Sequence, residues 1–262
     1  GDSTPMSSPS TEAMITEESS ESVLDALWDL PVLYSNKENP ILQEFRIVGR
    51  YQGQYAVVDS DQGNFDDWEN RRWRVGAGAK LFNNVSLKGY INIDEDFNPF
   101  YKSLEELHMT IKVADALNLT IGKQKPLWGY EWSTSSSKIL TIERGLLTNQ
   151  LLPAKSSGVA ADGEVNGFSY NVGVYSGDLD DEFGGFDGGT FYTASIGYDF
   201  SENSGMDKLA WRFDYLYNDQ DAGDTAAKPY ENSFATSLVV GQGDLTVVNE
   251  VLYASGDSPD VY

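Results

Sequence analysis

The segment Glu44–Val58, EFRIVGRYQGQYAVV, decides the fold because its side chains alternate between two chemical classes. Every second residue from Phe45 is apolar, aromatic or glycine, and the residues between them include Arg46, Arg50 and two glutamines. A period of two is that of a β-strand with one apolar and one polar face. The segment therefore predicts a strand that separates an apolar environment from a polar one.

Ten further segments repeat this strand-like pattern. They run over residues 68–82, 85–93, 106–113, 117–124, 157–162, 168–176, 190–200, 209–218, 232–240 and 245–255. Most have about the 9–11 residues that a tilted strand needs to cross a bilayer. The sequence contains no stretch of about 18 apolar residues, so it predicts no transmembrane helix. The sequence thus predicts eleven strands.

The connections between the predicted strands alternate in length. Short polar turns at 83–84, 162–167, 201–206 and 241–243 are set against long, mostly acidic connections at 59–67, 94–102, 126–156, 177–189 and 219–229. Transmembrane barrels sort their connections in this way, because their turns are short on the periplasmic side and long outside. We therefore predict an all-β, antiparallel, up-and-down transmembrane β-barrel.

Periodicity alone does not say which face of the sheet is outside. Aromatic residues cluster near strand ends, as Tyr51, Tyr55, Tyr215 and Tyr217 do, and the polar faces carry charges interleaved with glycine. Aromatic rings prefer the headgroup level of a membrane, and a water-filled lumen accepts charge. Both observations favour an apolar face toward lipid. A soluble β-barrel binding protein, with its apolar face inward, is the alternative.

The formal net charge of −23 argues against nucleic acid as a partner. The acidic residues gather in the long connections and the N-terminal tail, whereas the polar strand faces look basic. The predicted pore-lining and anion-binding residues are Arg46, Arg50, Arg72, Arg74, Lys80, Lys88, Lys112 and Arg212. Basic residues along a pore favour anions. In the alternative interpretation they pair with neighbouring carboxylates and only brace the wall.

The longest connection, 126–156, is predicted to be functional, because long loops in compact domains usually are. Its apolar stretches at 139–142 and 146–147 predict that it packs against the inner wall and narrows the pore. The basic residues of this predicted constriction loop are Lys125, Lys138, Arg144 and Lys155.

The N-terminal region differs from the barrel domain, which is predicted over 42–262. Residues 1–22 are rich in Ser, Thr, Glu and Pro, which predicts a disordered tail. Apolar residues at helical spacing over 23–34, limited by Pro31, predict a short amphipathic helix and a linker to residue 41 on the periplasmic side. Eleven strands are an odd number, so we expect further strands beyond this sequence.

Catalysis and metal binding find little support in the sequence. His108 is the only histidine, and no G-x-S-x-G motif accompanies it, so we do not expect an enzyme. The acidic stretch 178–187 lacks the spacing of an EF-hand, which favours a solvated loop over a Ca²⁺ site. No catalytic residue, cofactor or metal is predicted.

Several short segments resemble the phosphate-selective porin O and P family. They are GKQKP at 122–126, IER at 142–144, LLP at 151–153 before Gly158, FRIVGRYQ at 45–52 and FNP at 97–99. The resemblance implies an outer-membrane barrel of about 16 strands, usually a homotrimer among lipid and lipopolysaccharide of a Gram-negative-type bacterium, with its third loop folded inward. In selective members, lumenal arginines and lysines near the constriction choose anions; the matching candidates are Arg46, Arg50, Arg72, Arg74, Lys125, Lys138 and Arg144.

The leading functional hypothesis is therefore a passive outer-membrane channel for small hydrophilic solutes, weighted toward anions and including phosphate as a candidate. An alternative from another class is a structural barrel that anchors an envelope or surface partner through residues 1–36. In either hypothesis the N-terminus is expected in the periplasm.

Overall fold

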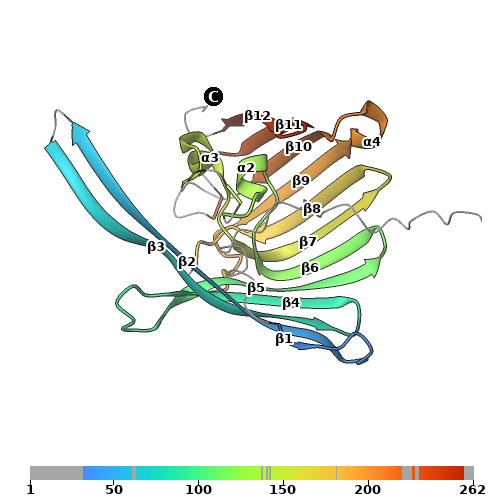
Figure 1. The fold of residues 1–262 in the computed structure, drawn as a ribbon, viewed down its shortest axis with the longest axis horizontal. Coiled ribbons are helices and arrows are strands. Elements are labelled where there is room, and N and C mark those ends of the chain that lie inside the picture. Colours follow the sequence, from blue (N-terminus) through green and yellow to red (C-terminus); the bar gives the residue numbers. More distant parts are fainter. Residues whose placement is uncertain are drawn as a thin grey trace, which may run out of the picture.

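The computed structural model describes residues 32–60, 63–136, 138–139, 141, 143–180, 182–219, 226–227 and 230–256. Within these residues, twelve strands form one sheet in which each strand pairs with the next strand of the chain (Figure 1). Every pairing is antiparallel. In the same ranges, no helix has both the length and the apolar character that crossing a membrane requires.

The elements follow one another as a simple meander. The strands are β1 (Val32–Ser35), β2 (Leu42–Ser60), β3 (Gly63–Leu81), β4 (Val85–Ile93), β5 (Tyr101–Ala114), β6 (Leu117–Gln124), β7 (Ser156–Val165), β8 (Phe168–Ser176), β9 (Thr190–Asp199), β10 (Lys208–Asn218), β11 (Asn232–Gln242) and β12 (Leu245–Ser255). The short helices are α2 (Tyr130–Ser133), α3 (Leu146–Leu151) and α4 (Ser201–Ser204).

The predicted all-β antiparallel fold class is confirmed. The sheet curves around the connection between β6 and β7, so that α2 and α3 lie on its concave side (Figure 1). The sheet is not closed, because β1 and β12 are its two edges and do not pair with each other.

The two faces of the sheet are inverted relative to those of a soluble protein. Tyr192 and Ile196 of β9 are exposed, whereas Thr193 and Ser195 between them are buried. The same inversion brings Asp214 of β10 to only 1% exposure. A barrel whose apolar face meets lipid and whose polar face lines the interior requires this arrangement. The predicted orientation of the faces is confirmed.

The predicted long connection 59–67 is wrong. β2 continues to Ser60 and β3 begins at Gly63, so the acidic residues of this region belong to two long paired strands. Tyr55 lies opposite Trp68, and its hydroxyl donates a hydrogen bond to Asp66 at 2.6 Å. Cross-strand pairing continues through the acidic stretch, with Asp59 opposite Asn64 and Val57 opposite Asp66.

The N-terminal prediction is only partly covered by the structure. The tail 1–22 and most of the predicted helix lie outside the described residues. The last part of that helix prediction is wrong, because Val32–Ser35 is a strand, β1, that pairs with β2. Val32, Leu33 and Tyr34 therefore add a twelfth strand to the eleven predicted.

The main apolar core lies on the concave side of the sheet, between β7–β12 and the connection of residues 125–155, called the inner loop below. Trp128 and Leu151 of the inner loop are buried against Tyr175, Phe191 and other residues of the wall. The rings of Tyr175 and Phe191 stack with centroids 5.1 Å apart. The prediction that this connection packs against the inner wall is confirmed.

Gly158 of β7 is required for the ring of Tyr175 to lie flat on the sheet. A Cβ at this position would lie 2.3 Å from the carbonyl oxygen of Val174 and 2.5 Å from Cδ1 of Tyr175. Gly158→Ala is therefore expected to destabilise the folded barrel by about 1–3 kcal/mol, as overpacking does. The loss is measured as the shift of the urea midpoint in gels of unboiled samples, where folded barrels migrate apart from unfolded chains.

Gly78→Ala is the matched control, because the nearest atom to its Cβ would be Cγ of Arg46 at 3.4 Å, the middle of a flexible side chain. Equal urea midpoints for the two variants would contradict this explanation of the packing at Gly158.

Candidate functional site

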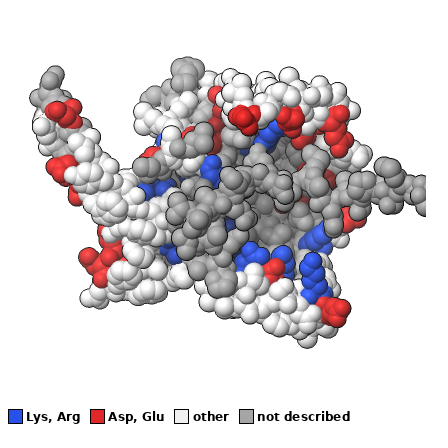
Figure 2. All heavy atoms as spheres, viewed as in Figure 1, with Lys and Arg blue, Asp and Glu red and all other residues white. Residues whose placement is uncertain are grey.

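A cavity of about 550 Å³ lies between the inner loop and the wall formed by β2–β6. Its lining includes three carboxylates, Glu105, Glu106 and Glu143, and more than twice as many basic side chains. The basic residues are Arg50, Arg71, Arg72, Arg74, Lys88, Lys125, Arg144 and Lys155. Figure 2 shows Lys and Arg in the hollow of the sheet and most of the visible Asp and Glu near its rim.

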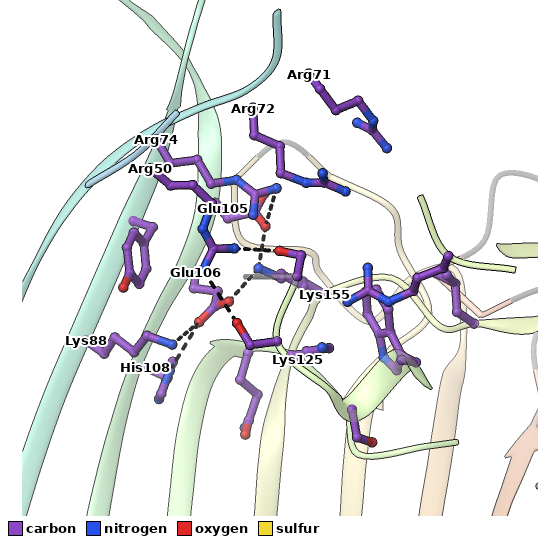
Figure 3. A pocket seen from close by; sticks show the side chains of 18 of the residues that line it. Arg50, Arg71, Arg72, Arg74, Lys88, Glu105, Glu106, His108, Lys125 and Lys155 are labelled. Carbon is purple, nitrogen blue, oxygen red and sulfur yellow. Dashed lines mark hydrogen bonds and ion pairs between the residues drawn. The ribbon is translucent and has the colours of Figure 1, made fainter. Parts of the chain in front are cut away.

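A β-bulge in β3 turns two adjacent arginines toward the cavity. Gln52 of β2 lies opposite Arg72, but the next residue, Gly53, lies opposite Asn70, which leaves Arg71 as the extra residue. A bulge places two residues of one strand against one residue of its partner and re-aims a side chain. Arg71 and Arg72 both line the cavity for this reason (Figure 3).

A second bulge, in β5, does the same for two glutamates. Tyr90 of β4 lies opposite Glu106 and Ile91 lies opposite Leu104, so Glu105 is the extra residue. Both carboxylates line the cavity. Strict alternation assigns one residue of each adjacent pair to the outside, so the sequence prediction missed Arg71 and Glu105. Two neighbouring like charges within a strand were the signal that could have revealed each bulge.

The two glutamates form ion pairs with three of the basic side chains. Glu105 pairs with Arg74 at 2.8 Å and with Lys155, whereas Glu106 pairs with Lys88 at 3.0 Å and with Lys155 (Figure 3). Lys155 ends the inner loop, so this network also ties the loop to β5. Arg74 and Lys88 thus form the pairs with neighbouring carboxylates that the alternative interpretation expected.

Four other basic side chains of the cavity form no ion pair with a carboxylate in the described part of the chain. Arg72 donates to the amide oxygen of Gln52 at 3.0 Å, and Arg50 donates to the hydroxyl of Ser136. Lys125 and Arg144 donate to backbone carbonyl oxygens of the inner loop. These four side chains, called the unpaired cations below, give the cavity most of its excess positive charge.

Two side chains of the inner loop, Lys125 and Glu143, have pKa values below their ordinary values. Burial, together with the nearby charges of Arg144 and Lys155, lowers the pKa of Lys125 to about 7. The hydrogen bond from Arg71 lowers the pKa of Glu143 below its ordinary value, so that this carboxylate stays charged. Lys125 is therefore a cation of the cavity whose charge changes near neutral pH.

The inner loop is also fixed to the opposite wall. The amide of Gly129, just before α2, donates to Asp214 of β10 at 2.9 Å, and the amide of Glu131 donates to Glu250 of β12 at 3.2 Å. Arg212 donates to the carbonyl oxygen of Gly129 at 2.6 Å. Carboxylates that accept free amides at the start of a helical turn stabilise it. The loop therefore bridges the interior from β10–β12 to β3, where Arg71 pairs with Glu143.

The remaining predicted site residues lie apart from the cavity. Arg46 and Lys80 pair with Glu44 near the short turn between β3 and β4, and Lys112 pairs with Asp115 at the turn between β5 and β6. Arg212 faces the inner loop and Asp214, and Lys138 is an exposed residue of that loop. The structure thus brings together seven of the twelve predicted basic residues: Arg50, Arg72, Arg74, Lys88, Lys125, Arg144 and Lys155.

His108 lines the cavity with its Nε2 atom 3.6 Å from Glu106. Its Nδ1 atom is buried and has no hydrogen-bond partner among the residues that the structure describes. Across the described residues, no group of three or more His, Cys, Asp or Glu side chains could hold a metal ion.

Comparison with known proteins agrees with this architecture. The sequence model of the family described as phosphate-selective porin O and P matches residues 45–242, which include most of β2, all of β3–β11 and the whole inner loop. A search of curated proteins found no match. The match covers well over half of the 262 residues. The chain therefore belongs to the phosphate-selective porin O and P family and is an outer-membrane porin that forms a channel for small solutes.

Proposed function

We propose that this porin is a passive diffusion channel that prefers small anions, phosphate among them. The observation that carries the proposal is the charge of the cavity beside the inner loop, where eight basic side chains face three carboxylates. The four unpaired cations, Arg50, Arg72, Lys125 and Arg144, are the residues that we assign to anion contact.

Confinement strengthens the effect of the cavity's charges on a passing ion. A narrow passage with low-dielectric walls focuses the field of its charges, so an excess of positive charge raises the local concentration of anions and lowers that of cations. Guanidinium groups such as those of Arg50 and Arg72 also match the paired oxygens of carboxylates and phosphates. Because hydroxyl, amide and carbonyl oxygens hold the unpaired cations, an entering anion does not have to displace a carboxylate.

We further propose the orientation and surroundings of the channel. The short turns and the N-terminus face the periplasm, and the long connections face outside, as the sorting of connections in outer-membrane barrels supports. The exposed apolar outer face, with Val159, Val172 and Ile196, supports contact with membrane lipid and lipopolysaccharide. Assembly as a homotrimer is part of the same proposal and rests on the family.

Transport of solutes of matched size tests the proposed preference. Proteoliposomes carrying the purified porin are placed in glucose, gluconate or glucosamine, and the swelling rate is recorded for each. We expect gluconate to enter fastest and glucosamine slowest, because the three differ chiefly in charge. Fastest entry of glucosamine would refute the anion preference, and a lack of swelling in all three would refute the channel at this size of solute.

A further inference from the structure

Trp132 of α2 lies against two of the unpaired cations. The Nζ atom of Lys125 is 4.5 Å from the centre of the ring, and the guanidinium carbon of Arg144 is 4.9 Å from it. The indole is buried, and its Nε1 atom donates to the carbonyl oxygen of Pro126 at 3.1 Å. The ring is therefore fixed in place before any solute enters.

The same two cations share one carbonyl oxygen. Lys125 donates to the backbone oxygen of Thr134 at 3.1 Å, and Arg144 donates to that oxygen at 3.0 Å. Two like charges that share one acceptor must lie close together, although they repel each other. The electron-rich face of an indole attracts cations, and this attraction grows when the cations are partly removed from water. The ring and the carbonyl oxygen offset the repulsion.

We propose that Trp132 is a positioning residue that holds Lys125 and Arg144 as one fixed pair of charges at the cavity, and that this pair sets the strength of the anion preference. The inference rests on the proposed function. It adds an uncharged residue, Trp132, to the residues that determine anion selectivity. Both cations of the pair line the cavity together with the ring.

Burial and the charged groups around Lys125 determine how the pair responds to pH. Arg144, Lys155 and Lys88 oppose its protonation and Glu106 favours it. With the pKa of Lys125 lowered to about 7, the pair carries its full charge below neutral pH and loses one charge above it. The anion preference should therefore fall as pH rises through about 7. Without the ring, Lys125 loses a favourable contact of its charged form, so the fall should occur at lower pH.

The experiment compares Trp132→Leu with Trp132→Phe in planar bilayers under a KCl gradient, over a range of pH. Leucine fills part of the space but has no ring, whereas phenylalanine keeps an aromatic face. We expect Trp132→Leu to lower the anion-to-cation permeability ratio about fivefold at neutral pH and to move the midpoint of its pH profile downward. Trp132→Phe should retain most of both properties.

Trp211→Leu is the control for the loss of a tryptophan as such. Trp211 is partly exposed on the opposite face of β10, where its ring nitrogen donates to Thr236 at 3.0 Å, and this variant should keep the wild-type ratio and pH profile.

A double-variant comparison separates positioning from general packing. If the ring acts through Lys125, then Lys125→Met should have little further effect once Trp132 is leucine, because interacting residues give non-additive changes. Full additivity, or a wild-type ratio in Trp132→Leu, would overturn the inference. If the wild-type protein itself showed no anion preference, the proposed function would be refuted instead.

A second probe covers the case in which Trp132→Leu does not fold. Fluorinated tryptophan introduced at position 132 alone keeps the shape of the ring but weakens its attraction for cations. The permeability ratio should then fall stepwise with the number of fluorine atoms, and a constant ratio would contradict the positioning role.

Discussion

Replacing Arg72 and Lys125 together, as Arg72→Gln with Lys125→Met, should strongly reduce the anion preference of the channel below neutral pH, where Lys125 is charged. Both are unpaired cations of the cavity, so their removal leaves no carboxylate without its partner. Two elementary charges a few ångströms from a passing ion each contribute on the order of kilocalories per mole at an effective dielectric constant near 20. We therefore expect the anion-to-cation permeability ratio in planar bilayers to fall by about tenfold or more.

The matched control removes two positive charges away from the cavity. Lys80→Met with Lys112→Met changes the net charge by the same amount, but these lysines pair with Glu44 and Asp115 near the short turns. Its permeability ratio should stay close to that of the wild type. An equal loss in both double variants would show that total charge, rather than the cavity, determines selectivity.

Loosening the inner loop should widen the channel. Asp214→Ala with Glu250→Ala removes the carboxylates that accept the amides of Gly129, Tyr130 and Glu131 at the start of α2. Asp214 also pairs with Arg212 at 3.0 Å and is almost fully buried, so its loss leaves the partly buried Arg212 without its carboxylate partner, which is destabilising. We expect single-channel conductance to rise about twofold, since conductance scales with open cross-section, and larger neutral sugars to pass.

Conductance steps in planar bilayers and swelling of proteoliposomes in sugars of increasing size measure this change. Asp207→Ala is the control, because Asp207 accepts an amide, that of Gly243, at an exposed turn outside the interior. It should leave both conductance and size limit unchanged. Wild-type conductance and size limit in the double variant, with the protein still folded, would mean that the inner loop does not limit the pore.

Most of the fold could be predicted from the sequence, because each strand has its own local pattern. The alternation in β2, with Phe45, Ile47 and Tyr51 on one side and Arg46 and Arg50 on the other, follows from the geometry of a strand between lipid and water. The same period located β4, β6, β8 and β12 to within a residue or two.

The errors in predicting the fold came from sequence signals that compete with the two-residue period of a strand. Carboxylates at Asp59, Asp66 and Asp67 predicted a loop, yet cross-strand partners extend β2 and β3 through them. The helical spacing up to Tyr34 predicted a helix, but the free edge of β2 takes up Val32–Ser35 as a paired strand. Pairing partners are distant in the sequence and are not encoded in a short window.

The cavity could be predicted only in part for a related reason. A bulge shifts the period by one residue, so strict alternation does not bring Arg71 and Glu105 to the polar face. The inner loop was predicted from its length and apolar content, but its contacts with Asp214 and Glu250 depend on residues more than eighty positions away. The pairing of each cation likewise depends on contacts between residues that are distant in the sequence, so composition does not reveal which cations remain unpaired.

The most direct test of the central claim is the reversal potential of the wild-type porin in a planar bilayer under a KCl gradient at pH 6. At this pH Lys125, whose pKa is lowered to about 7, is protonated and all four unpaired cations are charged. The structure predicts a potential with the sign of chloride selectivity, and the potential should decrease in size above neutral pH. A potential with the sign of potassium selectivity would contradict the assignment of the cavity as the anion-selective part of the channel.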